Sequence, residues 1–158
     1  TVENAPADAD SGLTYEEGTW TPTLIPSGTG FDAITYDPGV GGKYTKIGNL
    51  VHIKGFMRTD SITVGSASGT IRLGGLPFTV AADSDASLSF DGRSTLNISA
   101  VKDFAGEQPN TGFIEQNTTT VQLLYRSAVD GATADVVVAD VDTGANDNYM
   151  FFSGTYAA

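Results

Sequence analysis

The stretch DVDTGANDNY at residues 140–149 gathers oxygen-bearing side chains of the kind that bind a hard cation such as calcium. The candidate ligands are Asp140, Asp142, Asn146, Asp147 and Asn148. An EF-hand loop needs Gly at its sixth position and Glu at its twelfth, but Gly144 falls at the fifth position here and no Glu follows. The EF-hand is therefore excluded. An irregular calcium site and a plain polar loop both stay open, and we expect no other cofactor.

The sequence offers little for nucleophilic catalysis. His52 is the single histidine and cysteine is absent, so a disulfide scaffold and a thiolate metal site are excluded. Any Ser-His-acid triad would have to use His52, which lies in the middle of a strand-like run. No nucleophile elbow, P-loop or H-E-x-x-H motif occurs. We therefore expect that the protein is not an enzyme, with the paired carboxylates of a glycoside hydrolase as the remaining alternative.

The charge of the chain limits the classes of partner that it can bind. The 158 residues carry a formal net charge of −11, and acids without any base concentrate in residues 1–20 and 127–158. Phosphate backbones are bound by basic stripes, so we expect no nucleic-acid partner. No apolar run approaches the roughly 20 residues of a membrane helix, so we expect no membrane insertion either. The acidity fits a soluble extracellular protein.

The elements that must position these residues are short strands. β-Branched and aromatic runs alternate with clusters of Gly, Asp, Asn and Ser, and no helical apolar face is visible. We expect an all-β, antiparallel protein with a β-sandwich, jelly-roll or barrel architecture. The expected strands are 19–25, 33–37, 42–47, 49–59, 69–74, 77–81, 86–90, 94–102, 111–116, 119–127, 132–140 and 149–156.

Alternation along these strands predicts which side chains face the core. In LVHIKGFMR, Val51, Ile53 and Met57 share the expected core face, and the opposite face mixes Phe56 with polar residues. The run at 149–156 has large apolar groups on both faces, and such a strand is covered on both sides. Its second cover is expected to be either a loop or a second subunit.

Three ordered motifs resemble a C-terminal β-rich module of tail fibres and tailspikes from tailed bacteriophages. They are YEEGTWTPTL at 15–24, GKYTKIGNLVHIKG at 42–55 and SGTIRLGGLPF at 68–78, and the ending FFSGTYAA is similar to the closing strand of such modules. The resemblance implies a jelly-roll-like β-sandwich that forms a homotrimeric tip in the virion tail fibre and binds a host-surface glycan or protein. It also implies scaffold roles for Trp20, Tyr44, Ile47, Val51, Leu76 and Phe78.

We expect two regions, because the N-terminal residues are small, polar and acidic and show no strand or helix periodicity. Residues 1–17 are expected to be a linker or the end of an upstream stalk, and 18–158 the receptor-binding domain. The matched motifs do not extend into residues 81–118. Receptor choice would lie in exposed loops, expected at 26–33, 60–68, 82–93, 103–110, 127–132 and 141–148.

Polar groups beside an aromatic face are the mixture that sugar recognition uses. Within these loops and beside them, the expected glycan-binding residues are Tyr36, Asp83, Asp85, Arg93, Asn110, Asn146 and Asn148. Each of them is also an ordinary turn or strand-end residue. Three alternatives remain: a trimerisation or capping module of a fibre, a polysaccharide-degrading spike, and a secreted carbohydrate-binding module.

Overall fold

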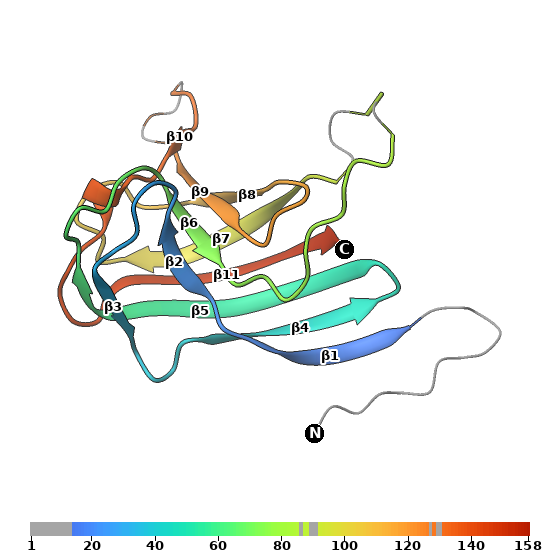
Figure 1. Ribbon diagram of the computed structural model, residues 1–158, viewed down its shortest axis with the longest axis horizontal. Coiled ribbons are helices and arrows are strands. Elements are labelled where there is room, and N and C mark those ends of the chain that lie inside the picture. Colours follow the sequence, from blue (N-terminus) through green and yellow to red (C-terminus); the bar gives the residue numbers. More distant parts are fainter. Residues whose placement is uncertain (1–13, 86, 89–91, 127, 129–130) are drawn as a thin grey trace.

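The computed structural model describes residues 14–85, 87–88, 92–126, 128 and 131–158 (Figure 1). These residues form strands and one short 3₁₀-helix, η1 (Val138–Asp140). The strands are β1 (Tyr15–Trp20), β2 (Thr23–Pro26), β3 (Ala33–Tyr36), β4 (Gly41–Ile47), β5 (Leu50–Thr63), β6 (Ile71–Gly74), β7 (Ser94–Lys102), β8 (Thr111–Ile114), β9 (Val121–Tyr125), β10 (Ala134–Asp135) and β11 (Asp147–Ala157). In the described part of the chain, no helix is long and apolar enough to span a membrane.

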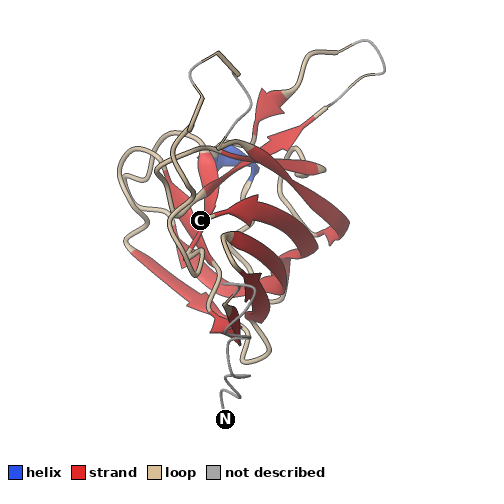
Figure 2. Ribbon diagram, turned by 90° about the vertical axis from the view of Figure 1, so that its right-hand side faces the viewer, coloured by secondary structure: helices blue, strands red, loops and turns tan. Residues whose placement is uncertain are grey.

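The strands make one continuous antiparallel sheet in the order β1-β4-β5-β11-β7-β8-β9-β6-β2, with β3 added to β5 and β10 to β9. β1 and β2 lie at opposite ends of this order, yet only Thr21 and Pro22 separate them in the chain. The sheet must therefore curl until its two ends approach each other (Figures 1 and 2). The predicted all-β, antiparallel class is confirmed, whereas the two-sheet sandwich is not: the architecture is a strongly curled half-barrel.

The concave side of the sheet holds the core. Val51, Ile53 and Met57 of β5 are fully buried there, as the alternation predicts. From β11, Met150, Phe152 and Tyr156 point into the same core. The other buried members are Trp20, Leu24, Ile62, Ile71, Leu73, Leu76, Val80, Leu96, Ile98, Ile114, Val121, Leu123, Val136 and Val141.

Trp20 belongs to this core and not to an exposed surface. Only 7% of the residue is exposed, and its ring contacts Phe152 with centroids 5.7 Å apart. Two glycines make room for these rings: a Cβ at Gly42 would lie 2.2 Å from Trp20 Nε1, and one at Gly55 would lie 2.5 Å from Phe152 Cε2. The scaffold role expected for Trp20 agrees with this packing. Ile47 is different, because it is 48% exposed and lies outside the core.

Several expected elements differ from the observed ones. The single strand expected at 19–25 is two strands interrupted at Thr21 and Pro22, and β1 begins at Tyr15, three residues before the expected domain start. β5 continues to Thr63 and pairs with β3, so residues 60–63 are strand and not loop. Of the strand expected at 86–90, only residues 87–88 are described, and they form no strand.

Of two further expected strands, the one at 77–81 is not observed, and the one at 132–140 is reduced to the two residues of β10, Ala134–Asp135. The segment 77–81 forms no strand; its Val80 N–H donates to the carbonyl of Thr118 instead. Most of 132–140 is also irregular, and η1 replaces the end of that run. The Asp140 carboxylate accepts hydrogen bonds from the N–H groups of Val137 (2.8 Å) and Glu107 (3.0 Å), which holds this segment in a turn.

Candidate functional site

Four of the expected loops, at 26–33, 60–68, 103–110 and 141–148, meet at one end of the sheet, which we call the loop end (Figure 1). Backbone hydrogen bonds join them: Gly28 N–H to Ser68 O (3.0 Å), Ile62 N–H to Thr143 O (3.3 Å) and Asn148 N–H to Asp103 O (2.8 Å). These hydrogen bonds tie the four segments to one another.

Asn148 is the centre of the loop end. It is completely buried, and its side-chain amide donates to Thr59 Oγ1 (2.7 Å) and to the carbonyl of Asp142 (2.8 Å). Its side-chain oxygen accepts the Asp142 N–H (2.9 Å). The backbone φ is +51° at Asn148 and +67° at Asn146, a left-handed conformation that Asn tolerates better than most residues. Asn148 therefore holds the loop together, while Asn146 is exposed beside it.

The acids of the loop end repel one another. Partial burial raises the pKa of the Asp147 carboxyl, and the nearby carboxylates of Asp142 and Asp103 raise it further. Among the described residues, no group of three or more His, Cys, Asp or Glu side chains is arranged to hold a metal ion. The irregular calcium site therefore stays a prediction.

Tyr36 and Asn110 have separate surroundings. The Tyr36 hydroxyl accepts the N–H of Leu24 (2.9 Å), and burial raises its pKa. Tyr36 thus braces β2 against β3 from the half-buried side. Asn110 is exposed just before β8, and its backbone N–H donates to the carbonyl of Leu124 (2.9 Å).

The other three expected residues lie in the segment between β6 and β7, away from the loop end (Figure 1). Asp83 pairs with Arg93 (3.6 Å) and accepts the Gln116 side-chain amide (2.9 Å). Asp85 accepts the N–H and the hydroxyl of Ser87, which closes a small turn. The seven expected residues are therefore divided among separate places, and their contact with a glycan stays a prediction.

The convex side of the sheet, which we call the outer face, carries a group that the sequence-based list of site residues omits. Phe56 of β5 and Phe151 of β11 are direct cross-strand partners, with ring centroids 5.0 Å apart and planes at 35°. Tyr149 stands nearly perpendicular to Phe151, at 5.6 Å and 78°. Phe151 is 44% exposed, so it offers a ring to the solvent. We call these three residues the aromatic cluster.

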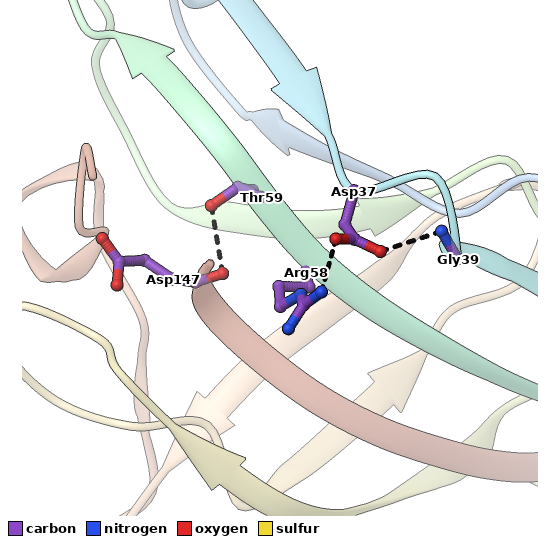
Figure 3. Close-up of polar contacts among 5 residues, drawn as sticks. All are labelled: Asp37, Gly39, Arg58, Thr59 and Asp147. Atoms are coloured by element: carbon purple, nitrogen blue, oxygen red, sulfur yellow. Dashed lines mark hydrogen bonds and ion pairs between the residues drawn. The ribbon is translucent and has the colours of Figure 1, made fainter. Parts of the chain in front are cut away.

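Charged groups support the aromatic cluster at its border with the loop end. Lys102 Nζ lies 4.7 Å from the Tyr149 ring centroid and 3.9 Å from an Asp103 carboxylate oxygen. Arg58, two residues after Phe56, pairs with Asp37 (Figure 3). The Gly39 N–H (2.9 Å) and the Arg58 guanidinium stabilise the charged form of Asp37 and lower its pKa.

Adjacent residues of β5 therefore serve different partners. Figure 3 shows Arg58 reaching Asp37 at the end of β3, while the neighbouring Thr59 donates its hydroxyl to the Asp147 carbonyl at the start of β11 (3.1 Å). This alternation separates the outer face from the interior of the loop end. The aromatic cluster escapes the sequence pattern because β5 and β11 are neighbours in the sheet but distant in the chain. The available signal was the run at 149–156, apolar on both sides.

Comparison with known proteins gives a match in structure. No protein-family model matches the chain, and no curated protein matches it in sequence. The fold is similar to that of the Dettilon tailspike protein (gp208), with a TM-score of 0.64 and 18% sequence identity over 90% of this chain. The match covers 24% of the tailspike chain, so the likeness concerns about a quarter of that protein. The chain thus has a fold that is found in part of a tailspike.

Proposed function

We propose that this chain is a receptor-binding domain of a phage tail fibre or tailspike, that it works as a homotrimer in the virion, and that it binds a host-surface glycan without cleaving it. The observation that carries the proposal is the fold similarity to a tailspike over 90% of the chain. The tail-fibre motifs at 15–24, 42–55 and 68–78 support it from the sequence.

The mechanism is multivalent adhesion. Three copies in one tip turn the second and third contacts into intramolecular events, so weak individual sites give firm attachment. A curled, cross-bonded sheet suits this task, because a rigid support keeps the sites at fixed separations.

The main test is binding of the fluorescently labelled chain to a panel of bacterial strains, compared with the same strains after periodate oxidation of their surface glycans. We expect saturable binding to some strains and its loss after oxidation. Binding that survives oxidation but disappears after protease treatment of the cells would identify a protein receptor. If the chain binds none of the strains in a panel that spans many bacterial genera, the proposal is wrong.

The solution mass tests the assembly. Sedimentation equilibrium should give three times the 16.4 kDa of one chain. A monomer at micromolar concentration contradicts the homotrimer and favours a secreted carbohydrate-binding module. Incubation with the bound glycan should release no fragments, and product formation would show a polysaccharide-degrading enzyme.

One observation favours a second candidate, a structural capping module. Many polar groups of the loop end are already used in hydrogen bonds within the chain, as at Asn148. Asn146→Gly and Asn110→Ala remove exposed side chains, and the glycine tolerates the positive φ of Asn146. Unchanged cell binding by both variants, with the trimer intact, would leave the loop end with a structural role.

A further inference from the structure

Two lysines face each other on the outer face, and no described carboxylate pairs with either of them. Lys43 of β4 and Lys54 of β5 are direct cross-strand neighbours, and both are exposed. Like charges placed directly opposite each other destabilise a sheet. Neither lysine forms an ion pair with any described residue, although the chain as a whole has a net charge of −11.

Protection of a sheet edge does not explain this pair. Lysines often guard edge strands against pairing with other chains. β4 and β5, however, are interior strands, with β1 on one side and β11 on the other. The pair is therefore free to serve an external anion.

The neighbours of the lysine pair are suited to sugar hydroxyls. Ser153 of β11 is the cross-strand partner of Lys54, and Asn97 of β7 is the partner of Ser153. In the adjacent row, His52 Nδ1 lies 3.2 Å from Thr155 Oγ1. Hydroxyl, amide and imidazole groups thus continue the row of cations across the sheet.

The aromatic cluster borders the same row. Phe56 follows Lys54 by two residues on the same face, a separation of about 7 Å. Its partner on β4 is Gly41, where an added Cβ would meet nothing within 4 Å. Gly41 is the first residue of β4, and a glycine in a sheet can mark a bulge, a bend, or a place where a ligand or another backbone approaches closely. Here Gly41 leaves open space at the β4 position that pairs with Phe56, whose partner on β11 is the exposed Phe151.

Few described carboxylates on this face would repel a bound anion. Glu17 of β1 lies opposite Thr45, diagonal to Lys43, and accepts the hydroxyl of Tyr15. Asp37 is paired with Arg58, and Asp103 lies near Lys102. Asp60 is exposed farther along β5, near the loop end. Among the described residues, the charged side chains at the centre of the face are those of Lys43 and Lys54.

We propose that the outer face of β4, β5, β11 and β7 binds an anionic polysaccharide, with the lysine pair on its carboxylate or phosphate groups and Phe56 and Phe151 against the apolar faces of its sugar rings. Charge-assisted hydrogen bonds and ring contacts together give both affinity and selection for charge. This inference rests on the proposed function and adds the chemical class of the glycan.

A second copy of the chain is the competing occupant of this face. Stable subunit interfaces are depleted of charge at their centres, with aromatic and apolar residues there and polar residues at the rim. The outer face has the reverse arrangement: lysines, serine, asparagine and histidine lie in the middle, with Phe151 toward one end and Ile47 and Leu50 at the other. This order favours an anionic polysaccharide over a second copy of the chain.

The test compares charged and neutral forms of one backbone by isothermal titration on the full chain. Polygalacturonate oligosaccharides and their methyl esters test whether the chain binds carboxylates. Phosphomannan and neutral mannan test whether it binds phosphate groups on a glycan, and inorganic phosphate alone tests whether it binds a simple anion. We expect at least one charged form to bind about tenfold more tightly than its neutral counterpart. Raising the ionic strength from about 0.05 M to about 0.5 M should weaken that binding, because the Debye length shortens.

Variants locate the binding. Lys43→Gln with Lys54→Gln should remove the preference for the charged form, whereas Arg126→Gln, an exposed charge between β9 and β10, should not change it. Gly41→Val should weaken binding of both forms and leave the melting temperature unchanged, since its side chain enters open space beside Phe56.

Three outcomes overturn the inference. Equal affinity for charged and neutral forms is one, and full charge preference in the Lys43→Gln, Lys54→Gln variant is another. The third is dissociation of the oligomer by Phe151→Ser, which would show that a second copy covers the face. If this double variant still binds bacterial cells as the unchanged chain does, the inference fails but the proposed function stands. If the unchanged chain binds no cells, the proposed function itself fails.

Discussion

The loop end and the outer face use the same strand in opposite ways. At the loop end, Asn148 is the second residue of β11, and its whole side-chain amide is bonded to neighbouring groups of the chain. Three residues later, Phe151 presents a ring that is 44% exposed. Lys43 and Lys54, on the same face as Phe151, have no carboxylate partner among the described residues.

This difference teaches how to separate polar groups that maintain the fold from those that are available to a ligand. Loop position and polar chemistry do not make a binding residue when all its hydrogen bonds are already formed within the chain. Conversely, an exposed sheet face can hold the free groups, because its backbone is satisfied by the ladder and its side chains are not needed for folding.

The largest effect is expected at Asn148. Asn148→Ala leaves the Asp142 N–H without its acceptor and forces alanine into a positive φ, so the free energy of unfolding should fall by about 2–4 kcal/mol. Urea denaturation followed by tryptophan fluorescence measures this. Asn148→Gly tolerates the positive φ without strain, so its free energy of unfolding should fall by less than that of Asn148→Ala. An alanine variant as stable as the unchanged chain would mean that the loop end does not depend on this amide.

The next effect is expected on the core side of β11. The Tyr156 hydroxyl donates to the Phe78 carbonyl (3.1 Å) and accepts the Phe78 N–H (3.2 Å), so Tyr156→Phe should cost about 1–2 kcal/mol. Burial raises the pKa of Tyr156 from 10.0 to about 12. Because the folded pKa is the higher one, this stabilisation is complete below pH 10 and is lost as the pH rises toward 12.

Alkaline unfolding curves of the two proteins check the pH dependence. The Phe variant should show a smaller loss of stability between pH 10 and 12, with the remainder due to the other tyrosines of raised pKa, such as Tyr36. Parallel curves for both proteins would contradict the assignment to Tyr156.

Substitution of the lysine pair on the outer face should raise the stability of the chain instead of lowering it. Lys43→Gln with Lys54→Gln removes a like-charge pair, so the free energy of unfolding should rise by about 0.5 kcal/mol. Lys46→Gln is the matched control, because Lys46 Nζ lies 4.7 Å from the Phe78 ring centroid and its removal should lower stability by about 0.5 kcal/mol. Destabilisation of the double variant would show that the lysine pair has a structural partner.

The smallest effect is expected at Asp147. Asp147→Asn removes a carboxylate that is repelled by Asp142 and Asp103, so stability at pH 7 should rise by less than about 0.5 kcal/mol. The folded pKa of Asp147 is raised above 3.8, so the native chain regains this stability when acid protonates the group. The gain should therefore vanish in melting curves below pH 3.8, and a gain that persists there has another cause.

Local patterns predicted the strands whose partners are near in sequence. The alternation of Val51, Ile53 and Met57 identified the core side of β5, and the predicted bounds 94–102 are those of β7. The strand predicted at 132–140 is observed only at Ala134–Asp135, because the Asp140 carboxylate bonds the backbone of Glu107, a distant partner that propensity cannot reveal. The segment 77–81 has strand-like residues, but its backbone bonds to the turn near Thr118.

The candidate sites show the same limit. The sequence placed Asn148 in a polar loop, but its burial follows from contact with Thr59, which lies 89 positions earlier. The pairing of Phe56 with Phe151 required knowledge that β5 and β11 are adjacent. The lysine pair could have been predicted from the sequence, because a tight turn at Gly48 and Asn49 places Lys43 opposite Lys54.

The position of β11 in the middle of the sheet has a consequence for biosynthesis. β11 joins β5 to β7, so until residues 147–157 leave the ribosome both of those strands keep an unpaired border. Until then the sheet is incomplete, and the unpaired backbone groups of β5 and β7 can pair with other nascent chains. Closing contacts between such remote segments also makes folding slow, on the order of milliseconds to seconds. β11, which follows the other strands of this sheet in the chain, therefore completes the sheet.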